Sequence, residues 1–203
     1  MAKVAAKPIR KGTIVLTIVG TSPLITHAWP EKAKQMMREK HAGKKTKTRE
    51  VRDPEAEAMD AAYTTPDGKF GILGLALKTS LVTAAHKDVG IEKTLVRKSL
   101  FLELPDPSGV LPLLEQDMPE VREDMVRVGA GSADLRYRPM WSSWRVRASF
   151  VVDFENLTPD DVATLVTRAG FGVGLGEWRP EKGGEFGRFE IDTSEPYLVE
   201  VEE

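Results

Sequence analysis

The stretch RVRASFVVDFENLTPDDVATLVTRAGFGVGLGEWRPEKGGEFGRFEI, residues 145–191, decides the fold. Its beginning alternates between apolar and polar residues, which is the period-two pattern of a strand. Thr158 and Pro159 then form a strong helix start, as N-cap and first helical residue, and apolar residues follow at helical spacing. We expect this helix to stop at Gly170, and a second strand at 186–191 to follow a glycine-rich loop. The order strand, helix, loop, strand indicates an α+β fold.

The first half of the chain adds elements of the same kinds. We expect strands at 13–20 and 100–104, a short hairpin at 63–72, and helices at 31–39 and 75–86. Residues 106–144 show little regular pattern, so no element is expected there. This order favours one domain, residues 1–203, with an open antiparallel or mixed sheet of ferredoxin-like type and helices on one face.

Charge is distributed unevenly along a chain whose net charge is only -2. Any nucleic-acid binding must therefore come from local patches. A basic run at 32–52 includes Lys44, Lys45 and Lys47, and residues 40–58 are interpreted as a flexible arm or partly helical insertion. Residues 192–203 form an acidic tail. Both runs can be solvated faces, but they also permit head-to-tail contact between subunits, or a tail that competes with nucleic acid.

The composition excludes several classes of protein. The chain has no cysteine, which excludes disulfides, thiol catalysis and thiolate zinc sites. No apolar stretch is long enough to cross a bilayer, and the N-terminus lacks a signal-peptide pattern, so a cytoplasmic protein without membrane contact is expected.

The glycine-rich loop is the first candidate binding segment, with seven glycines between residues 170 and 189. Glycines allow positive φ and close approach of a ligand, while nearby cations bind phosphates and a tryptophan offers a stacking surface. The loop follows a helix, so it is no dinucleotide fingerprint, and it lacks the Gly-Lys-Ser/Thr ending of a Walker loop. The alternative is an ordinary tight loop with a core tryptophan. The candidate residues are Gly174, Gly176, Trp178, Arg179, Lys182 and Arg188.

The second candidate segment, RYRPMWSSWRVR at 136–147, interleaves arginines with aromatic rings. Such a pattern suits a sequence-tolerant single-strand binder, with cations for phosphates and rings for bases. Tryptophans are often mostly buried, so we expect about half of these rings to be core. The candidate residues are Arg136, Tyr137, Arg138, Trp141 and Arg145.

The sequence contains no self-sufficient catalytic constellation, cofactor motif or metal-ligand pattern. No two of His27, His41 and His86 are spaced as a metal-ligand pair. We therefore expect a protein that is not an enzyme and has no cofactor.

The stretch GVGLGEWRPEKGGEFGRFEI resembles the glycine-rich loop of the RAMP superfamily, RNA-binding ferredoxin-like proteins of CRISPR effector complexes. The segments IVGTSPLITH and FGILGLALKTSLVTAA, which contains Lys78, resemble the first strand and following helix of their backbone subunits. The whole chain also resembles small uncharacterised proteins of tailed bacteriophages and prophages. The RAMP resemblance implies a modified ferredoxin-like core with an early arm, a loop that grips a nucleic-acid backbone, and identical subunits stacked in a filament.

These observations favour a phage-type, non-enzymatic protein that binds single-stranded DNA or RNA as a homo-oligomer in replication or recombination. Three alternatives remain. They are a guide-RNA-binding CRISPR backbone subunit, a protein–protein interaction module such as a host-defence inhibitor or structural phage part, and an RNA endonuclease that uses His27.

Overall fold

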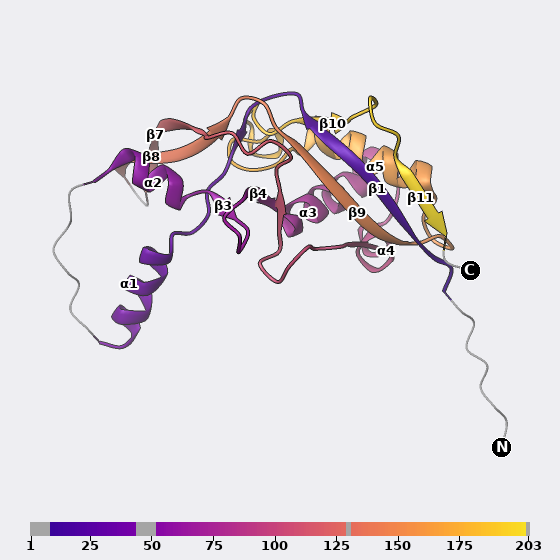
Figure 1. Cartoon of the computed structure of the whole chain (residues 1–203), viewed down its shortest axis with the longest axis horizontal. Coiled ribbons are helices and arrows are strands. Elements are labelled where there is room, and N and C mark those ends of the chain that lie inside the picture. The colour runs from indigo at the N-terminus through magenta and orange to yellow at the C-terminus, as the bar shows by residue number, and fades with distance from the viewer. Residues whose placement is uncertain (1–8, 44–51, 129–130, 202–203) are drawn as a thin grey trace, which may run out of the picture.

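The structure is a computed structural model that describes residues 9–43, 52–128 and 131–201. Helices and antiparallel strands are mixed along the chain (Figure 1). The helices are α1 (Glu31–His41), α2 (Pro54–Asp60), α3 (Gly74–Ala84) with a π-helical turn η1 (Ala85–Val89), α4 (Lys93–Ser99), α5 (Pro159–Gly172) and a 3₁₀ turn η2 (Pro180–Lys182). The strands are β1 (Lys11–Gly20), β2 (Leu24–Ile25), β3 (Tyr63–Thr64), β4 (Phe70–Leu73), β5 (Leu100–Leu102), β6 (Val110–Pro112), β7 (Glu120–Val128), β8 (Ser132–Trp141), β9 (Arg145–Asp153), β10 (Phe189–Ile191) and β11 (Leu198–Val201).

The largest sheet has the strand order β10-β1-β9-β5, with every neighbouring pair antiparallel. β11 pairs with the other half of the same edge of β1. Alternate residues of β1 and β9 are buried, among them Ile14 opposite Phe150 and Ile18 opposite Val146. One face of this sheet therefore supplies the core.

Helices α3 and α5 lie side by side behind this sheet (Figure 1). Leu77 and Leu81 of α3 and Leu165 of α5 are fully buried, and they belong to the same hydrophobic cluster as the inner face of β1 and β9. The sheet and its helices occupy the right-hand part of Figure 1, while α1, α2 and the β7–β8 hairpin lie at the other end.

Helix α5 begins as the sequence predicts but ends later. Thr158 Oγ1 accepts from the Asp161 amide at 3.1 Å, and the Asp161 carboxylate accepts from the Thr158 amide at 2.8 Å, which is a capping box. The expected stop at Gly170 is wrong, because the helix continues to Gly172. Gly170 instead allows close approach to β10, since a Cβ there would lie 1.9 Å from the Phe189 carbonyl oxygen.

The largest error of the sequence interpretation concerns residues 106–144, where it predicts no helix or strand. The structure places β6, β7 and β8 there, and β7 and β8 pair along their whole length from Glu120–Met140 to Val128–Ser132. The hairpin was missed because both strands alternate charged residues with few apolar ones, and β8 also contains Pro139. β2 extends this hairpin into a three-stranded sheet, and β3, β4 and β6 form another.

The arm and the tail are both partly structured. Within the expected arm, residues 54–58 belong to α2, which Asp53 caps through bonds to the Glu55 and Ala56 amides. Lys44, Lys45 and Lys47 lie outside the described residues. Within the tail, residues 198–201 form β11, in which every residue is exposed.

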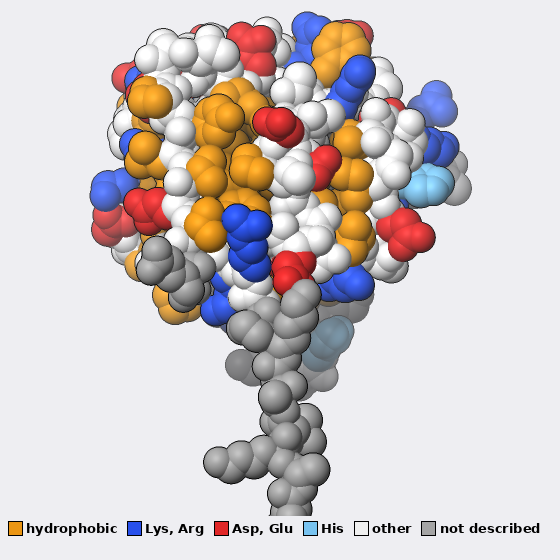
Figure 2. All heavy atoms as spheres, turned by 90° about the vertical axis from the view of Figure 1, so that its right-hand side faces the viewer, with side chains coloured by type: hydrophobic (Ala, Val, Ile, Leu, Met, Phe, Trp, Pro, Cys, Tyr) orange, Lys and Arg blue, Asp and Glu red, His pale blue; other side chains and the backbone are white. Residues whose placement is uncertain are grey.

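The end of the molecule that carries β11 exposes hydrophobic side chains between charged ones (Figure 2). Leu198, Val199 and Val201 retain 39–47% of their surface. This strand covers the edge of β1 but buries little of its own apolar surface.

Candidate functional site

A cleft of about 170 Å³ opens where the glycine-rich loop faces helix α3. The loop contributes residues 173–177, Arg179 and Glu181, and α3 contributes Ala76, Thr79, Ser80 and Thr83. His27 and Tyr63 line the remaining side. The glycine-rich loop and the front half of the chain thus meet at one place, whereas no residue of 136–147 is among those that line the cleft.

Close backbone contacts hold the loop beside the cleft. Gly176 has φ +72°, and a Cβ there would lie 2.1 Å from the carbonyl oxygen of Ile25. The neighbouring Glu177 amide donates to that same oxygen at 2.9 Å. Gly174, with φ +74°, lets the chain turn directly after α5. These two glycines are therefore required by the packing of the loop itself.

Trp178 has an unusual backbone conformation, with φ +54°. Positive φ is uncommon for a bulky residue and persists only where the surroundings impose it. Here the Trp178 carbonyl accepts from the Phe186 amide at 3.0 Å, and its indole Nε1 donates to Asp124 Oδ2 at 3.3 Å. The indole remains 41% exposed. Trp178 is therefore a fixed and partly open aromatic surface.

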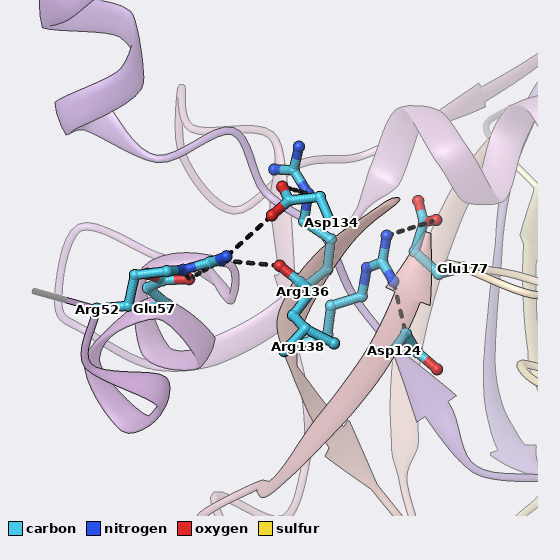
Figure 3. Close-up of polar contacts among 8 residues, drawn as sticks. Arg52, Glu57, Asp124, Asp134, Arg136, Arg138 and Glu177 are labelled. Carbon is cyan, nitrogen blue, oxygen red and sulfur yellow. Dashed lines mark hydrogen bonds and ion pairs between the residues drawn. The ribbon is translucent and has the colours of Figure 1, made fainter. Parts of the chain in front are cut away.

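Arg138 of β8 forms a nearly buried ion pair with Asp124 of β7 and a longer contact with Glu177 of the loop (Figure 3). Its guanidinium lies 3.1 Å from Asp124 and 3.8 Å from Glu177, and the side chains of Arg138 and Asp124 are 6% and 8% exposed. Arg122 also donates to Asp124, at 2.9 Å. Because Arg138 is buried and paired, its first role is to hold the loop against β7 and β8.

His27 lies between these charges and the cleft. Its Nδ1 is 4.0 Å from Glu177 Oε1. Burial and then the positive charge of Arg138 lower the pKa of His27, whereas Glu177 opposes the shift. The imidazole is therefore neutral near pH 7. Tyr63 donates its hydroxyl to the His27 carbonyl at 3.3 Å, and burial raises the pKa of Tyr63.

The structure brings together one group of the residues proposed from sequence. Gly174, Gly176 and Arg179 line the cleft, and the charges of Arg136 and Arg138 reach His27 at its edge. Arg136 pairs with Asp134 at 3.2 Å and keeps 39% of its side chain exposed. Lys182, in η2 beside Arg179, is exposed.

Other proposed residues are placed away from this cleft. Lys78 donates to the Arg97 carbonyl at 3.2 Å and covers the ring of Phe101. Arg145 pairs with Glu115 at 2.7 Å and with Asp192 at 3.3 Å, where the acidic tail begins. None of the groups that contact Lys78 or Arg145 lines the cleft.

The aromatic residues of the second segment divide between core and surface. Trp141 is 3% exposed and donates to the Asp117 carbonyl at 3.1 Å, so the expectation that its ring stacks on a base is wrong. Trp144, 1% exposed, is core as well. The Arg52 guanidinium lies over the Tyr137 ring, 5.3 Å from its centroid.

Arg188, from the glycine-rich segment, donates its backbone amide to Ser22 Oγ at 2.9 Å, and its guanidinium lies 4.0 Å from Glu185.

Sequence reasoning missed Tyr63, Asp124 and Glu177 as members of this site. Glu177 lies inside the glycine-rich loop, and a carboxylate among the cations of this loop could have indicated a role in the site. Asp124 and Tyr63 are distant in sequence from the loop, and nothing in their local pattern marks them. Only the tertiary fold brings Tyr63 to the cleft and Asp124 to Arg138 and Trp178.

No protein-family model matches the chain, and no curated protein shows significant sequence similarity to it. Within residues 9–43, 52–128 and 131–201, no group of three or more His, Asp or Glu side chains could hold a metal ion. None of the helices in these ranges is both long and apolar enough to span a membrane.

Proposed function

We propose that the chain is a non-enzymatic protein that binds single-stranded nucleic acid at the cleft between the glycine-rich loop and α3. Arg136 and Arg138 of β8 act electrostatically on His27 at the edge of the cleft that the loop also lines, and this approach of segments far apart in sequence carries the proposal. Trp178 adds a rigid, partly exposed ring of the kind on which bases stack. The proposal includes that the protein is of phage type and acts in the cytoplasm.

The arrangement of the largest sheet supports a modified ferredoxin-like core. In the order β1, α3, β5, β9, α5, β10, each strand–helix–strand unit is split by one antiparallel strand of the other unit. β9 lies between β1 and β5, and β1 lies between β9 and β10. A split βαβ arrangement of this kind is what the proposed ferredoxin-like core requires, and such cores are a common scaffold for RNA recognition by an open sheet.

The proposed binding relies on few cations, because most arginines of the region already contact carboxylates. Exposed Arg136 and Lys182 are the described cations best placed to meet phosphates at the rim of the cleft. We therefore expect moderate, salt-sensitive affinity in which stacking and hydrogen bonds supply a large share.

Filling the cleft tests the proposal without changing any charge. Ala76 is exposed and lines the cleft, so Ala76→Trp places a large ring where the strand would enter. We expect its affinity for a labelled single-stranded 12-mer to fall by at least about tenfold, the equivalent of one lost stacking contact. Fluorescence anisotropy measures this loss.

Leu75→Trp is the matched control. Leu75 is the preceding residue of the same helix, is 72% exposed and does not line the cleft. Its affinity is expected to remain within about twofold of the wild type. Equal affinities of the two variants would move the binding site away from the cleft.

In this proposal, several copies of the protein assemble as a homo-oligomer along the bound nucleic-acid strand. The exposed apolar edge of β11 supports this part, because an open strand edge with Val199 and Val201 uncovered is a template for pairing with another chain. Light scattering that gives the mass of a monomer both with and without nucleic acid would contradict the proposed oligomer. If the chain is instead a protein–protein interaction module, the β11 edge is expected to bind a different protein.

RNA cleavage is the second candidate function, and the pair of His27 and Glu177 favours it. The sequence offered His27 no partner, whereas the structure places the Glu177 carboxylate 4.0 Å from its Nδ1. A neutral imidazole beside a carboxylate can take the proton from a ribose 2′-hydroxyl. RNA fragments formed by the wild type and abolished by His27→Ala would favour cleavage over simple binding, and intact RNA after long incubation would exclude it.

A further inference from the structure

Three hydroxyl groups that line the cleft, those of Tyr63, Ser80 and Thr83, already donate hydrogen bonds to carbonyl oxygens of the protein. Ser80 Oγ donates to the Leu77 carbonyl at 2.8 Å and Thr83 Oγ1 to the Thr79 carbonyl at 2.9 Å. Tyr63 donates to the His27 carbonyl at 3.3 Å. Each hydroxyl oxygen therefore has only acceptor lone pairs left for a ligand.

Arg179, a charged group of the cleft, uses three of its five N–H donors within the protein. Arg179 directs its Nε and one terminal nitrogen to Glu181 and the other terminal nitrogen to the Gly176 carbonyl, at 2.7–3.0 Å. Glu177 has a side chain 40% exposed, an ion pair with Arg138 at 3.8 Å and a contact with the neutral His27 imidazole at 4.0 Å. Among the described residues, none donates a hydrogen bond to its carboxylate. The Glu177 carboxylate and the hydroxyl oxygens of Tyr63, Ser80 and Thr83 thus give the cleft free acceptors, while two N–H groups of Arg179 are its free cationic donors.

An acceptor-lined cleft suits a ligand that offers N–H donors. A phosphate carries only acceptor oxygens and would find few free donors here, so phosphates belong at the rim. The volume of about 170 Å³ lies below the roughly 300–1,000 Å³ of sites for drug-sized ligands, which leaves room for a single base. Ile72 and Val173 supply apolar walls against which a flat ring can lie.

We propose that the cleft holds one unstacked base of the bound strand and prefers a base with an exocyclic amino group. The amino group donates to the Glu177 carboxylate, as cytosine N4 does to acidic side chains elsewhere. Uracil has the same size as cytosine but presents an O4 acceptor to this carboxylate, which repels it. The inference rests on the proposed single-strand binding and adds a preference at one base position.

Anisotropy with labelled oligocytidine and oligouridine 12-mers at neutral pH tests this preference. We expect the wild type to bind oligocytidine about tenfold more tightly, within the range that one good base contact provides. Glu177→Gln is expected to reduce this ratio to about threefold or less, because the neutral amide accepts a weaker hydrogen bond and adds donors of its own.

Thr83→Val provides a second variant, since it removes an acceptor oxygen at nearly constant shape and leaves the Glu177 contacts to Arg138 and His27 intact. It should lower the same ratio by about twofold. Equal binding of both oligomers by the wild type would overturn the base preference and leave single-strand binding standing. A preference that survives in both variants would assign it to another surface. Binding to neither oligomer at low salt would instead refute the proposed function.

Discussion

Replacing Arg138 by alanine is expected to lower the free energy of unfolding by about 3 kcal/mol, because it leaves the buried carboxylate of Asp124 without its closest buried cation. Arg122 and Trp178 still donate to Asp124, which keeps the loss at the lower end for a broken buried pair. Urea unfolding followed by the fluorescence of the buried tryptophans measures the change.

Arg136→Ala is the matched control for this prediction. It removes the same type of side chain two residues away on β8, but that side chain is 39% exposed and pairs at the surface with Asp134. A loss of no more than about 0.5 kcal/mol is expected. Equal losses for the two variants would show that the Arg138 pair does not hold the loop and hairpin together. Only Arg136→Ala is therefore suited to testing phosphate contact without damage to the fold.

Gly176→Ala is expected to destabilise the loop and to abolish binding at the cleft. The position requires φ +72°, and the added methyl group would lie 2.1 Å from the Ile25 carbonyl oxygen, which is backbone and cannot move aside cheaply. We expect a loss of about 1–3 kcal/mol in the free energy of unfolding. The single-strand affinity, measured by anisotropy, should fall by at least about tenfold, since Glu177 and Arg179 shift with the loop.

Gly172→Ala separates this effect from a general cost of replacing glycines. Gly172 lies in the last turn of α5, has no positive φ, and a Cβ there meets no atom within 4 Å. Alanine should be neutral or stabilise the helix by up to about 1 kcal/mol. If Gly176→Ala behaved like Gly172→Ala in both stability and affinity, the loop would not form the wall of the binding site.

The sequence predicted those parts of the fold whose cause is local. The N-cap of α5 at Thr158, the hairpin at 63–72 and the strands β1 and β9 follow from nearest neighbours and periodicity, and the structure contains all of them. The end of α5 was missed because Gly170 reflects close packing on β10 and not a helix stop.

The parts that could not be predicted depend on partners distant in sequence. Glu123 and Asp124 gave no sign of a strand, because β7 presents ion pairs where most strands present apolar residues. Arg136 and Arg138 looked alike in the sequence, but Asp124 and Glu177 bury only the second of them. The residues that converge on the cleft were therefore recognisable by type, whereas their charge state and exposure required the tertiary structure.

Fluorescence anisotropy of the wild-type protein with labelled single-stranded RNA, single-stranded DNA and duplex, across a salt series, tests the central claim most directly. The account predicts binding to a single strand in preference to duplex. The logarithm of the affinity should fall with the logarithm of salt with a slope of about −1.4 to −2, as expected for two or three phosphate contacts. Absence of binding to any of the three at low salt would contradict single-strand binding and leave a protein-interaction module as the better account of this fold.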